Sequence, residues 1–326
     1  MAAVGRTYWL TEPCRIRRED NSIRIERPDT TPVRIPITDI RDLIAFDHID
    51  INTSAISLLS RSSVTIHVLD HYGNYAGSIS PAESMSSASV VRRQVELTAD
   101  QGNRLDISRS LVLATAENIC WSLNTDLLSP ALEKLQAALP ECTSTEEIMG
   151  QEGNFRRTAR EVLDTYLPPW LRLDGRTRRP PTNAGNAFIS YVNSIIYARL
   201  LTALRTTPLH TAIGFLHSET DRRRNTLALD LAEPFKPIFA ERLLKRTASQ
   251  KSLKPSDFET DVGKASLSKD GRRKISALLK EELATSVYHR SLKRKVSYEE
   301  LLHLEGLKLV RLCLEDKPYK PFRPWW

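Results

Sequence analysis

The first 80 residues alternate between apolar and polar positions, a pattern that predicts β-strands. The alternating apolar residues are Ile23 and Ile25, then Val33, Ile35 and Ile37, then Val64, Ile66 and Val68. Side chains with this spacing lie on one face of a strand. Polar turns at Asp20–Ser22 and Tyr72–Tyr75 separate neighbouring strands, and residues 52–60 predict a short helix. We therefore expect a small β-sandwich over residues 6–80.

The apolar spacing changes further along the chain to intervals of three and four residues, which predict helices. A stretch rich in Ser, Ala and Pro precedes this change and marks a linker. Ser144, with Glu147 three residues later, predicts a capping box where one helix begins. The predicted fold class is α+β. A β-sandwich domain at 1–80 and a linker at 81–90 precede a larger all-helical domain at 91–326.

The most apolar helical segment, residues 187–204, is interrupted by Asn193 and Arg199. It is therefore predicted to be a core helix and not a membrane span. The first ten residues include Arg6 and contain no apolar stretch typical of a signal peptide. The 4 cysteines form no CxxC motif, which argues against a zinc site and fits a reducing compartment. We expect a cytoplasmic protein that does not contact a membrane.

The net charge of +7 is unevenly distributed along the chain. Residues 1–80 and residues 81–233 each carry a net charge of −1, whereas residues 234–326 carry 21 basic and 12 acidic residues, or +9. A localised basic surface is typical of proteins that bind nucleic acid. The alternative is a solvated helical surface on which lysine provides solubility.

Candidate chemistry is concentrated on either side of a basic loop at residues 222–225. His217 follows an apolar run, while Asp230 and Glu233 lie three residues apart in a second apolar run. Such spacing places both acids on one helix face, where acids are rare unless they are paired or bind a metal. The segment therefore indicates a divalent metal site that faces phosphate. Alternatively, His217 is a core or capping histidine, and the two acids complement a helix dipole.

Glu152 is a further acid at an apolar position, because it lies on one helix face with Ile148 and Phe155. It is either a functional carboxylate or the ion-pair partner of Arg156, one turn later. Gly153 follows it and costs roughly 1 kcal/mol in a helix relative to alanine. A glycine at this position would let a DNA backbone or another helix approach closely.

Several motifs follow one another in a specific order. They are 149–157 (MGQEGNFRR), 178–181 (RRPP) with Asn186–Ala187, 214–217 (GFLH), 226–237 (TLALDLAEPFKP), 290–298 (RSLKRKVSY) and 321–326 (PFRPWW). Each motif alone is weakly specific. In this combination, and over most of its length, the chain resembles the CRISPR-associated integrase of spacer acquisition, the first member of the Cas protein series.

The resemblance implies a catalytic site made of Glu152, His217, Asp230 and Glu233. Glu152, His217 and Glu233 would bind Mg²⁺ or Mn²⁺, with Asp230 close behind them or serving as an occasional ligand. Lys236 would contact phosphate from the same helix face, or it is a simple surface lysine. Because removing an acid from a like-charged cluster relieves repulsion, alanine variants of the three ligands are expected to fold but lose activity.

The implied reaction is the attack of a DNA 3′-hydroxyl on a phosphodiester at the edge of a CRISPR repeat. The implied partners are double-stranded DNA, a second copy bound through residues 6–80, and the small ferredoxin-like second Cas protein. The predicted DNA contacts are Lys236, Arg222, Arg223, Arg224, Arg178, Arg290, Lys293, Arg294 and Lys295. Two alternatives remain, a metal-dependent repair nuclease and a DNA-binding subunit without activity.

Overall fold

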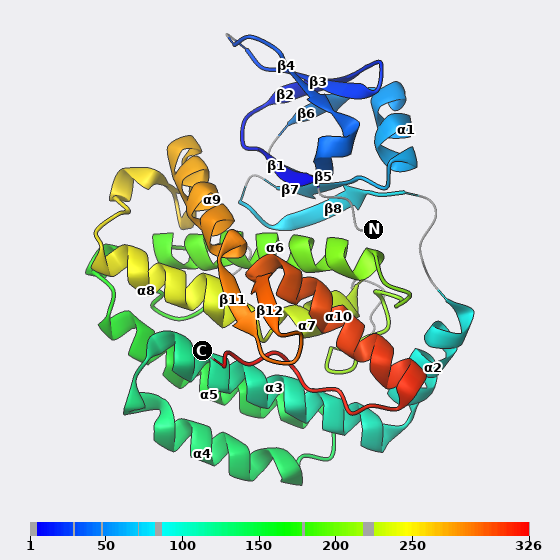
Figure 1. Cartoon of the computed structure of the whole chain (residues 1–326). Helices are drawn as coiled ribbons and strands as arrows, with labels where there is room; N and C mark the ends of the chain where they lie inside the picture. Colours follow the sequence, from blue (N-terminus) through cyan, green and yellow to red (C-terminus); the bar gives the residue numbers. More distant parts are fainter. Residues whose placement is uncertain are drawn as a thin grey trace.

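The computed structural model describes residues 5–28, 30–46, 48–70, 72–81, 87–177, 180–217 and 225–325. A unit of strands at the N-terminal end lies against a larger, mainly helical unit (Figure 1). Helix α6 (Ala184–Arg205) runs between the two units and contacts strands of the first and helices of the second. The α+β fold class predicted from the sequence is confirmed.

The N-terminal unit contains two four-stranded sheets. The first has the order β1 (Arg6–Leu10), β5 (Ile40–Phe46), β7 (Thr65–Leu69), β8 (Tyr75–Ile79), and the second β4 (Val33–Pro36), β3 (Ser22–Glu26), β2 (Cys14–Glu19), β6 (Ile49–Ile51). Strands β1, β5 and β7 are parallel, and β8 pairs antiparallel with β7. In the second sheet, β2, β3 and β4 are antiparallel and β6 is parallel to β2.

Both sheets contribute to one apolar core together with helix α1 (Thr53–Arg61). Ile23 and Ile25 enter this core from β3, and Ile66 enters it from β7, as the alternating pattern predicts. The helix predicted at residues 52–60 is present, and the Asn52 side chain accepts a hydrogen bond from the Ala55 amide at 3.0 Å. The predicted strands and the short helix are thus confirmed.

Nine α-helices and five short helical turns follow in the described residues. The helices are α2 (Ala88–Ala99), α3 (Gln101–Leu123), α4 (Ser129–Ala138), α5 (Thr145–Thr165), α6, α7 (Thr226–Ala232), α8 (Arg242–Ser249), α9 (Lys269–Ala284) and α10 (Tyr298–Glu315). The turns are η2 (Asp126–Leu128), η3 (Leu139–Glu141), η4 (Pro169–Leu171), η5 (Pro237–Glu241) and η6 (Pro255–Asp257), and η1 (Ile37–Asp39) lies among the strands.

The helix start predicted at Ser144 is confirmed, because the Ser144 side chain accepts from the Glu147 amide at 3.2 Å. The second half of the predicted capping box differs. The Glu147 carboxylate accepts from the amide of Thr143, at 2.6 Å, and not from the amide of Ser144. Helix α5 therefore begins where predicted, but the Glu147 side chain binds the amide one residue before the cap residue Ser144.

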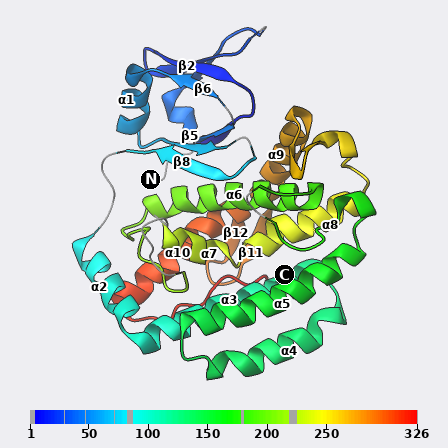
Figure 2. The same ribbon diagram turned by 180° about the vertical axis from the view of Figure 1, so that it is seen from behind.

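Helix α6 is long and apolar enough to span a membrane by composition, but 72% of its apolar window is buried inside the protein. Figure 2 shows it between the sheets and the lower helices. Its interrupting Arg199 is buried and pairs with Asp42 of β5 and Glu299 of α10. The prediction of a core helix therefore agrees with its position, and Arg199 links the two units.

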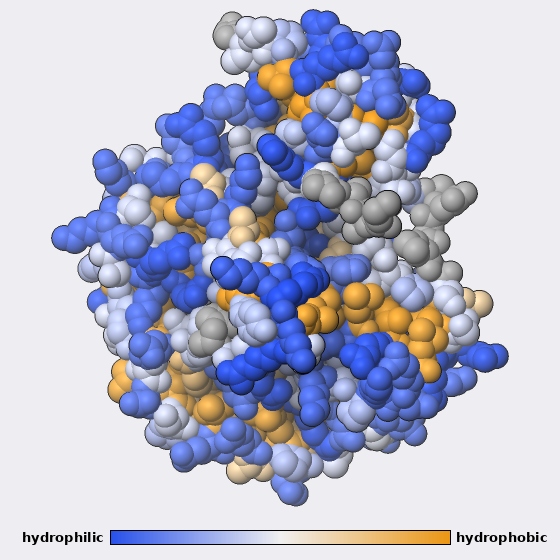
Figure 3. All heavy atoms as spheres, in the orientation of Figure 1, coloured by the Kyte–Doolittle hydropathy of each residue, from blue (hydrophilic) through white to orange (hydrophobic). Residues whose placement is uncertain are grey.

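The prediction that the larger unit is all-helical is wrong in one respect. Two short hairpins lie among its helices, β9 (Phe258–Asp261) with β10 (Lys264–Leu267), and β11 (Ser286–His289) with β12 (Arg294–Ser297). Each strand has only four residues, too few for alternation to distinguish it from a loop. Their turns include Gly263 and Lys293 with positive φ, at 70° and 51°. The face of the molecule in Figure 3, on which β11 and β12 lie, carries mainly hydrophilic residues with apolar patches between them.

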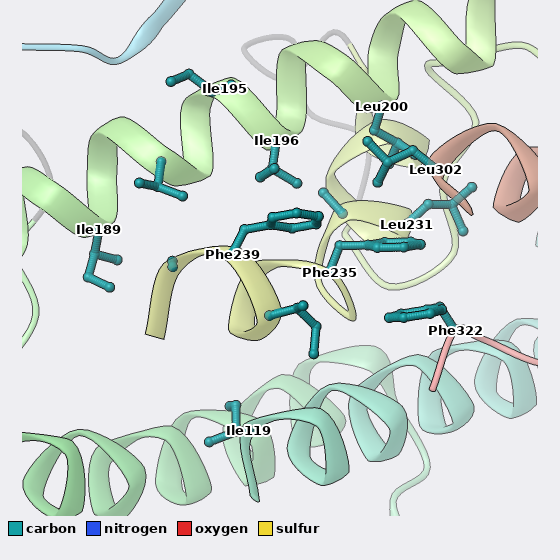
Figure 4. Close-up of a cluster of buried hydrophobic side chains, with 14 of the residues drawn as sticks. Ile119, Ile189, Ile195, Ile196, Leu200, Leu231, Phe235, Phe239, Leu302 and Phe322 are labelled. Carbon is teal, nitrogen blue, oxygen red and sulfur yellow. The ribbon is translucent and has the colours of Figure 1, made fainter. Parts of the chain in front are cut away.

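The C-terminal segment after α10 packs back on the helical core. Phe322 stacks on Phe235, just after α7, with ring centroids 4.5 Å apart (Figure 4). The Asn118 side chain of α3 donates to the carbonyls of both Phe322 and Pro234, at 3.0 and 2.7 Å. The chain end is thereby fixed next to the segment that carries Glu233.

Candidate active site

The loop before residue 218 is held against the first turn of α7. The hydroxyl of Thr226 accepts from the Gly214 amide at 3.0 Å and donates to the Ala212 carbonyl at 2.5 Å. A Cβ atom on Gly214 would lie 2.7 Å from the Asp230 carboxylate and 2.8 Å from Thr226. This close approach requires glycine at position 214.

Asp230 is fully buried and uses both carboxylate oxygens within this loop. One oxygen accepts from the amides of Phe215 and Leu216 at 2.6 and 3.0 Å. The other accepts from the amide of His217 at 3.1 Å and lies 2.7 Å from its Nδ1. When Nδ1 donates to Asp230, Nε2 of His217 carries the lone pair that can bind a proton or a metal. The geometry therefore gives Asp230 an orienting role toward His217.

Glu233 lies at the C-terminal end of α7, where the helical hydrogen bonding is interrupted. The next residue, Pro234, has no amide proton, and the π-helical turn η5 follows shortly after it. The Glu233 carboxylate pairs with Lys236 and, at 2.5 Å, with Arg156 of α5. Burial alone raises the pKa of Glu233, but Lys236, Arg156 and His217 outweigh it and hold the pKa well below its usual range. Glu233 is therefore a buried anion.

Glu152 joins the same cluster through Arg156. Nε of Arg156 donates to Glu152 at 2.7 Å, while another nitrogen of the same guanidinium donates to Glu233. The ion pair of Glu152 with Arg156, considered above as an alternative, is thus present, but Arg156 also binds a second acid. Burial lowers the pKa of Arg156, yet Glu152 and Glu233 more than reverse this and raise it above its usual value.

The donor set is chemically suited to a divalent cation. It offers two carboxylates, from Glu152 and Glu233, and an imidazole, from His217, all groups that bind Mg²⁺ or Mn²⁺. His217 is close enough to Glu233 to lower its pKa. Among the described residues, no three His, Cys, Asp or Glu side chains converge closely enough to hold an ion as they stand. Arg156 lies between the two carboxylates, and Lys236 also binds Glu233. The positive charges of these two side chains balance the negative charges of Glu152 and Glu233.

A cleft of about 750 Å³ opens beside Glu233, between α5, α6, α7 and strand β8. Its charged lining consists of Arg156, Arg160, Arg176, Arg205, Lys236, Glu233 and Glu241. Five basic side chains against two acidic ones favour a polyanion. Arg160 and Arg205 were not among the predicted site residues. Arg160 lies four residues after Arg156, so their shared helix face was a signal available in the sequence.

The predicted DNA contacts fall into three groups. Lys236 lines the cleft, which agrees with its expected position next to Glu233. Arg290, Lys293, Arg294 and Lys295 lie exposed on the β11–β12 hairpin, and none of them lines the cleft. Arg178, Arg222, Arg223 and Arg224 lie outside the described residues.

Two contacts limit the freedom of the hairpin arginines. Arg294 forms an ion pair with Glu300, with one of its nitrogens 3.0 Å from the carboxylate. Arg290 donates to the carbonyl of Trp325 at 3.0 Å. The hairpin is therefore fixed to α10 and to the chain end, and its turn faces solvent.

Comparison with known proteins identifies the family. The model for CRISPR associated protein Cas1 matches residues 7–281. The chain is 34% identical over 325 residues to the CRISPR-associated endonuclease Cas1 3 of Thermodesulfovibrio yellowstonii, covering 98% of this chain and 100% of the relative. A solved Cas1 protein from Thermotoga maritima aligns with a TM-score of 0.87 at 27% identity, covering 98% of this chain and 100% of that one.

Two less similar structures share the fold. A casposase bound to an integration product has a TM-score of 0.85 at 20% identity, covering 97% of this chain and 92% of that chain. A Cas6-RT-Cas1–Cas2 complex has a TM-score of 0.86 at 18% identity, covering 98% of this chain and 36% of that chain. From the family match and the identity over nearly its full length, we conclude that this chain belongs to the Cas1 family of CRISPR-associated proteins.

Proposed function

We propose that the chain is a metal-dependent DNA endonuclease and integrase that inserts short DNA fragments as new spacers into a CRISPR array. The observation that carries this proposal is the joining of Glu152 and Glu233 by Arg156, beside a basic cleft that Glu233 lines. His217 is near enough to Glu233 to lower its pKa. The relative in Thermodesulfovibrio is named an endonuclease, and the casposase with the same fold is bound to an integration product.

The proposed reaction is the transfer of a phosphodiester from one hydroxyl to another. The 3′-oxygen of the fragment attacks the phosphorus, and the 3′-oxygen of the cut strand leaves. Glu152, Glu233 and Nε2 of His217 would hold Mg²⁺ or Mn²⁺, which when bound activates the nucleophile and balances the charge on the phosphate. The histidine ligand favours Mn²⁺ over Mg²⁺, which prefers oxygen ligands.

The other residues orient and bind. Asp230 holds His217 with Nε2 directed away from the Asp230 carboxylate, because Nδ1 is engaged at 2.7 Å. Lys236 and Arg160 line the cleft and would bind phosphate oxygens of the DNA strand. A Cβ on Gly153, next to Glu152, would meet no other described element within 4 Å, which leaves room for DNA to approach.

The proposed partners are DNA, a second copy of the chain and the second Cas protein. A chain with the same fold was solved in a Cas6-RT-Cas1–Cas2 complex, which supports the second Cas protein as a partner. The strand unit is nearly neutral, which suits protein contact better than DNA contact, so we assign the homodimer contact to residues 6–80. Light scattering at micromolar concentration tests this, and a monomer would count against it. Action on a CRISPR array implies a cytoplasmic location.

A strand-transfer assay separates integration from the other two functions. A labelled fragment with a free 3′-hydroxyl is mixed with a supercoiled plasmid that carries a CRISPR repeat, with and without the second Cas protein. We expect metal-dependent transfer of label into the plasmid, none with a 3′-dideoxy fragment, and none with Glu152→Gln. Glu161→Gln, an exposed acid on the same helix, is the matched control and should retain transfer.

The remaining outcomes identify the alternatives. Metal-dependent nicking of the plasmid without joined label would indicate a repair nuclease. DNA binding with neither nicking nor transfer would indicate a subunit without catalytic activity. Either result would overturn the proposed integration.

A further inference from the structure

Arg156 holds the two acids of the cluster with a single guanidinium. Its contacts are 2.7 Å to Glu152 and 2.5 Å to Glu233, and all three side chains are at most 15% exposed. The two acids come from different elements, α5 and the end of α7. The guanidinium therefore sets the separation of the two carboxylates.

Glu152 and Glu233 are both negatively charged, so a cation is needed between them. Two buried carboxylates without a positive charge between them repel each other, and one of them would take up a proton. Arg156, together with Lys236 on Glu233, supplies positive charge at this position. A divalent ion bound by the same carboxylates would serve the same electrostatic purpose. It would compete with Arg156, which binds one oxygen of each acid.

We propose that Arg156 is a built-in counter-ion of the metal site. It positions Glu152 and Glu233 before a metal binds, and it competes with the metal for their oxygens. This inference rests on the proposed function, because it assumes that the two acids are metal ligands. It assigns Arg156 a positioning role, distinct from contact with DNA.

The competition predicts an unusual direction for a substitution at a functional site. Removing the charge of Arg156 should lower the free energy of unfolding of the metal-free protein, because Glu152 and Glu233 lose their shared partner. The same change should tighten metal binding, because a like charge no longer opposes the ion. A nearby charge shifts a buried equilibrium by about one to three powers of ten, so we expect at least about tenfold tighter Mn²⁺ binding.

The first test measures Mn²⁺ affinity by electron paramagnetic resonance of the free ion, in the absence of DNA. Arg156→Gln should bind Mn²⁺ about tenfold more tightly than the parent and should unfold at a lower temperature in EDTA. Arg157→Gln is the matched control, because Arg157 is exposed on the same helix and donates to Asn154 at 2.9 Å. It should change neither quantity.

The second test uses the parent protein and does not depend on a destabilised variant. The Nε–Hε signal of Arg156, assigned by its loss in Arg156→Lys, is followed by NMR while Mg²⁺ is added. We expect this signal to shift as Mg²⁺ binds, because the ion competes with Nε for the Glu152 carboxylate. The Nε–Hε signal of Arg157 should stay in place.

The outcomes distinguish this inference from the proposed function. If the parent binds no Mn²⁺, or if Glu233→Gln binds Mn²⁺ as tightly as the parent, the proposed metal site itself is wrong. If the parent binds Mn²⁺ through Glu233 but Arg156→Gln binds it equally or more weakly, only the counter-ion role is overturned. The role is also overturned if Mg²⁺ binds through Glu233 while the Arg156 signal does not move.

Discussion

Nδ1 of His217 lies 2.7 Å from a carboxylate oxygen of Asp230, and this contact connects the apolar loop to helix α7. Asp230 also accepts from three backbone amides of that loop, so it determines where His217 can lie. The sequence predicted Asp230 as a catalytic acid close to the metal. In the structure its oxygens are taken by the loop, which favours an orienting role over metal binding.

Gly214 tests this relationship, because a methyl group there would push against the Asp230 carboxylate at 2.7 Å. We expect Gly214→Ala to reduce the free energy of unfolding by about 1–3 kcal/mol, the usual cost of overpacking. Strand transfer should fall as well, since His217 is displaced. Urea denaturation and the integration assay measure the two effects.

Gly153 provides the matched glycine substitution, because it lies inside helix α5 and its added methyl would meet no other part of the described structure within 4 Å. Gly153→Ala should increase the free energy of unfolding by about 0.5–1 kcal/mol. If Gly214→Ala lowers the free energy of unfolding no more than Gly153→Ala does, close packing of the loop on Asp230 does not hold the loop in place.

Glu233 and His217 should respond differently to alanine substitution, which corrects an expectation from the sequence. Like-charge repulsion among the acids predicted that all ligand variants fold normally. In the structure, Glu233 instead pairs with two largely buried cations, Arg156 and Lys236. Glu233→Ala would leave both of them without this carboxylate. We expect a loss of about 3 kcal/mol for Glu233→Ala.

His217→Ala removes the contact between Nδ1 and Asp230, but the Asp230 carboxylate keeps three backbone amides as donors. This variant should therefore cost less than Glu233→Ala, while both variants lose strand transfer. Thermal and urea unfolding of the two purified variants compare them directly. Equal stability of Glu233→Ala and the parent would mean that the ion pairs contribute nothing to folding.

His67 should make stability depend on pH. Burial lowers its pKa from 6.5 to about 3, with Arg205 and Arg199 adding to the effect while Asp42 opposes it. Between these two pKa values the unfolded chain binds a proton that the folded chain does not, so stability falls as the pH decreases. The slope should reach about 1.4 kcal/mol per pH unit.

His67→Gln should flatten this slope between about pH 6 and pH 4, as measured by urea unfolding at several pH values. Asp42, with a pKa lowered from 3.8, loses its contribution at more acidic pH and does not interfere in this window. An unchanged slope in His67→Gln would show that other groups cause the acid sensitivity.

The β11–β12 hairpin should contribute to DNA binding through charge alone. Reversing Lys293, Arg294 and Lys295 together should weaken binding to all DNA sequences alike and flatten the dependence on salt, because phosphate contacts release counterions. Fluorescence anisotropy at several salt concentrations measures both. Metal binding should be unaffected.

A control with the same change in net charge reverses three dispersed exposed lysines, Lys134, Lys251 and Lys280. It should weaken DNA binding less than the hairpin variant. If the two variants bind equally, the hairpin charges only solvate the surface and the DNA path lies elsewhere.

The sequence was informative where a local pattern encodes the structure. Alternation identified the strands of the N-terminal unit, and the Ser144 cap identified the start of α5. Acids at apolar positions indicated Glu152 and Glu233, which Arg156 joins in the structure. The sequence could not show that Arg156 reaches across 77 residues to Glu233, because that contact depends on how α5 packs against α7. It could not show the role of Asp230 either, since its partners include backbone amides, which every residue except proline carries.

The central claim is that Glu152, His217 and Glu233 share a divalent metal ion, and an anomalous difference map from crystals grown with Mn²⁺ tests it most directly. We predict one strong peak bonded to both carboxylates and to Nε2 of His217, with Arg156 withdrawn from at least one acid. A map in which Mn²⁺ is absent from these side chains, under conditions that support strand transfer, would contradict the account.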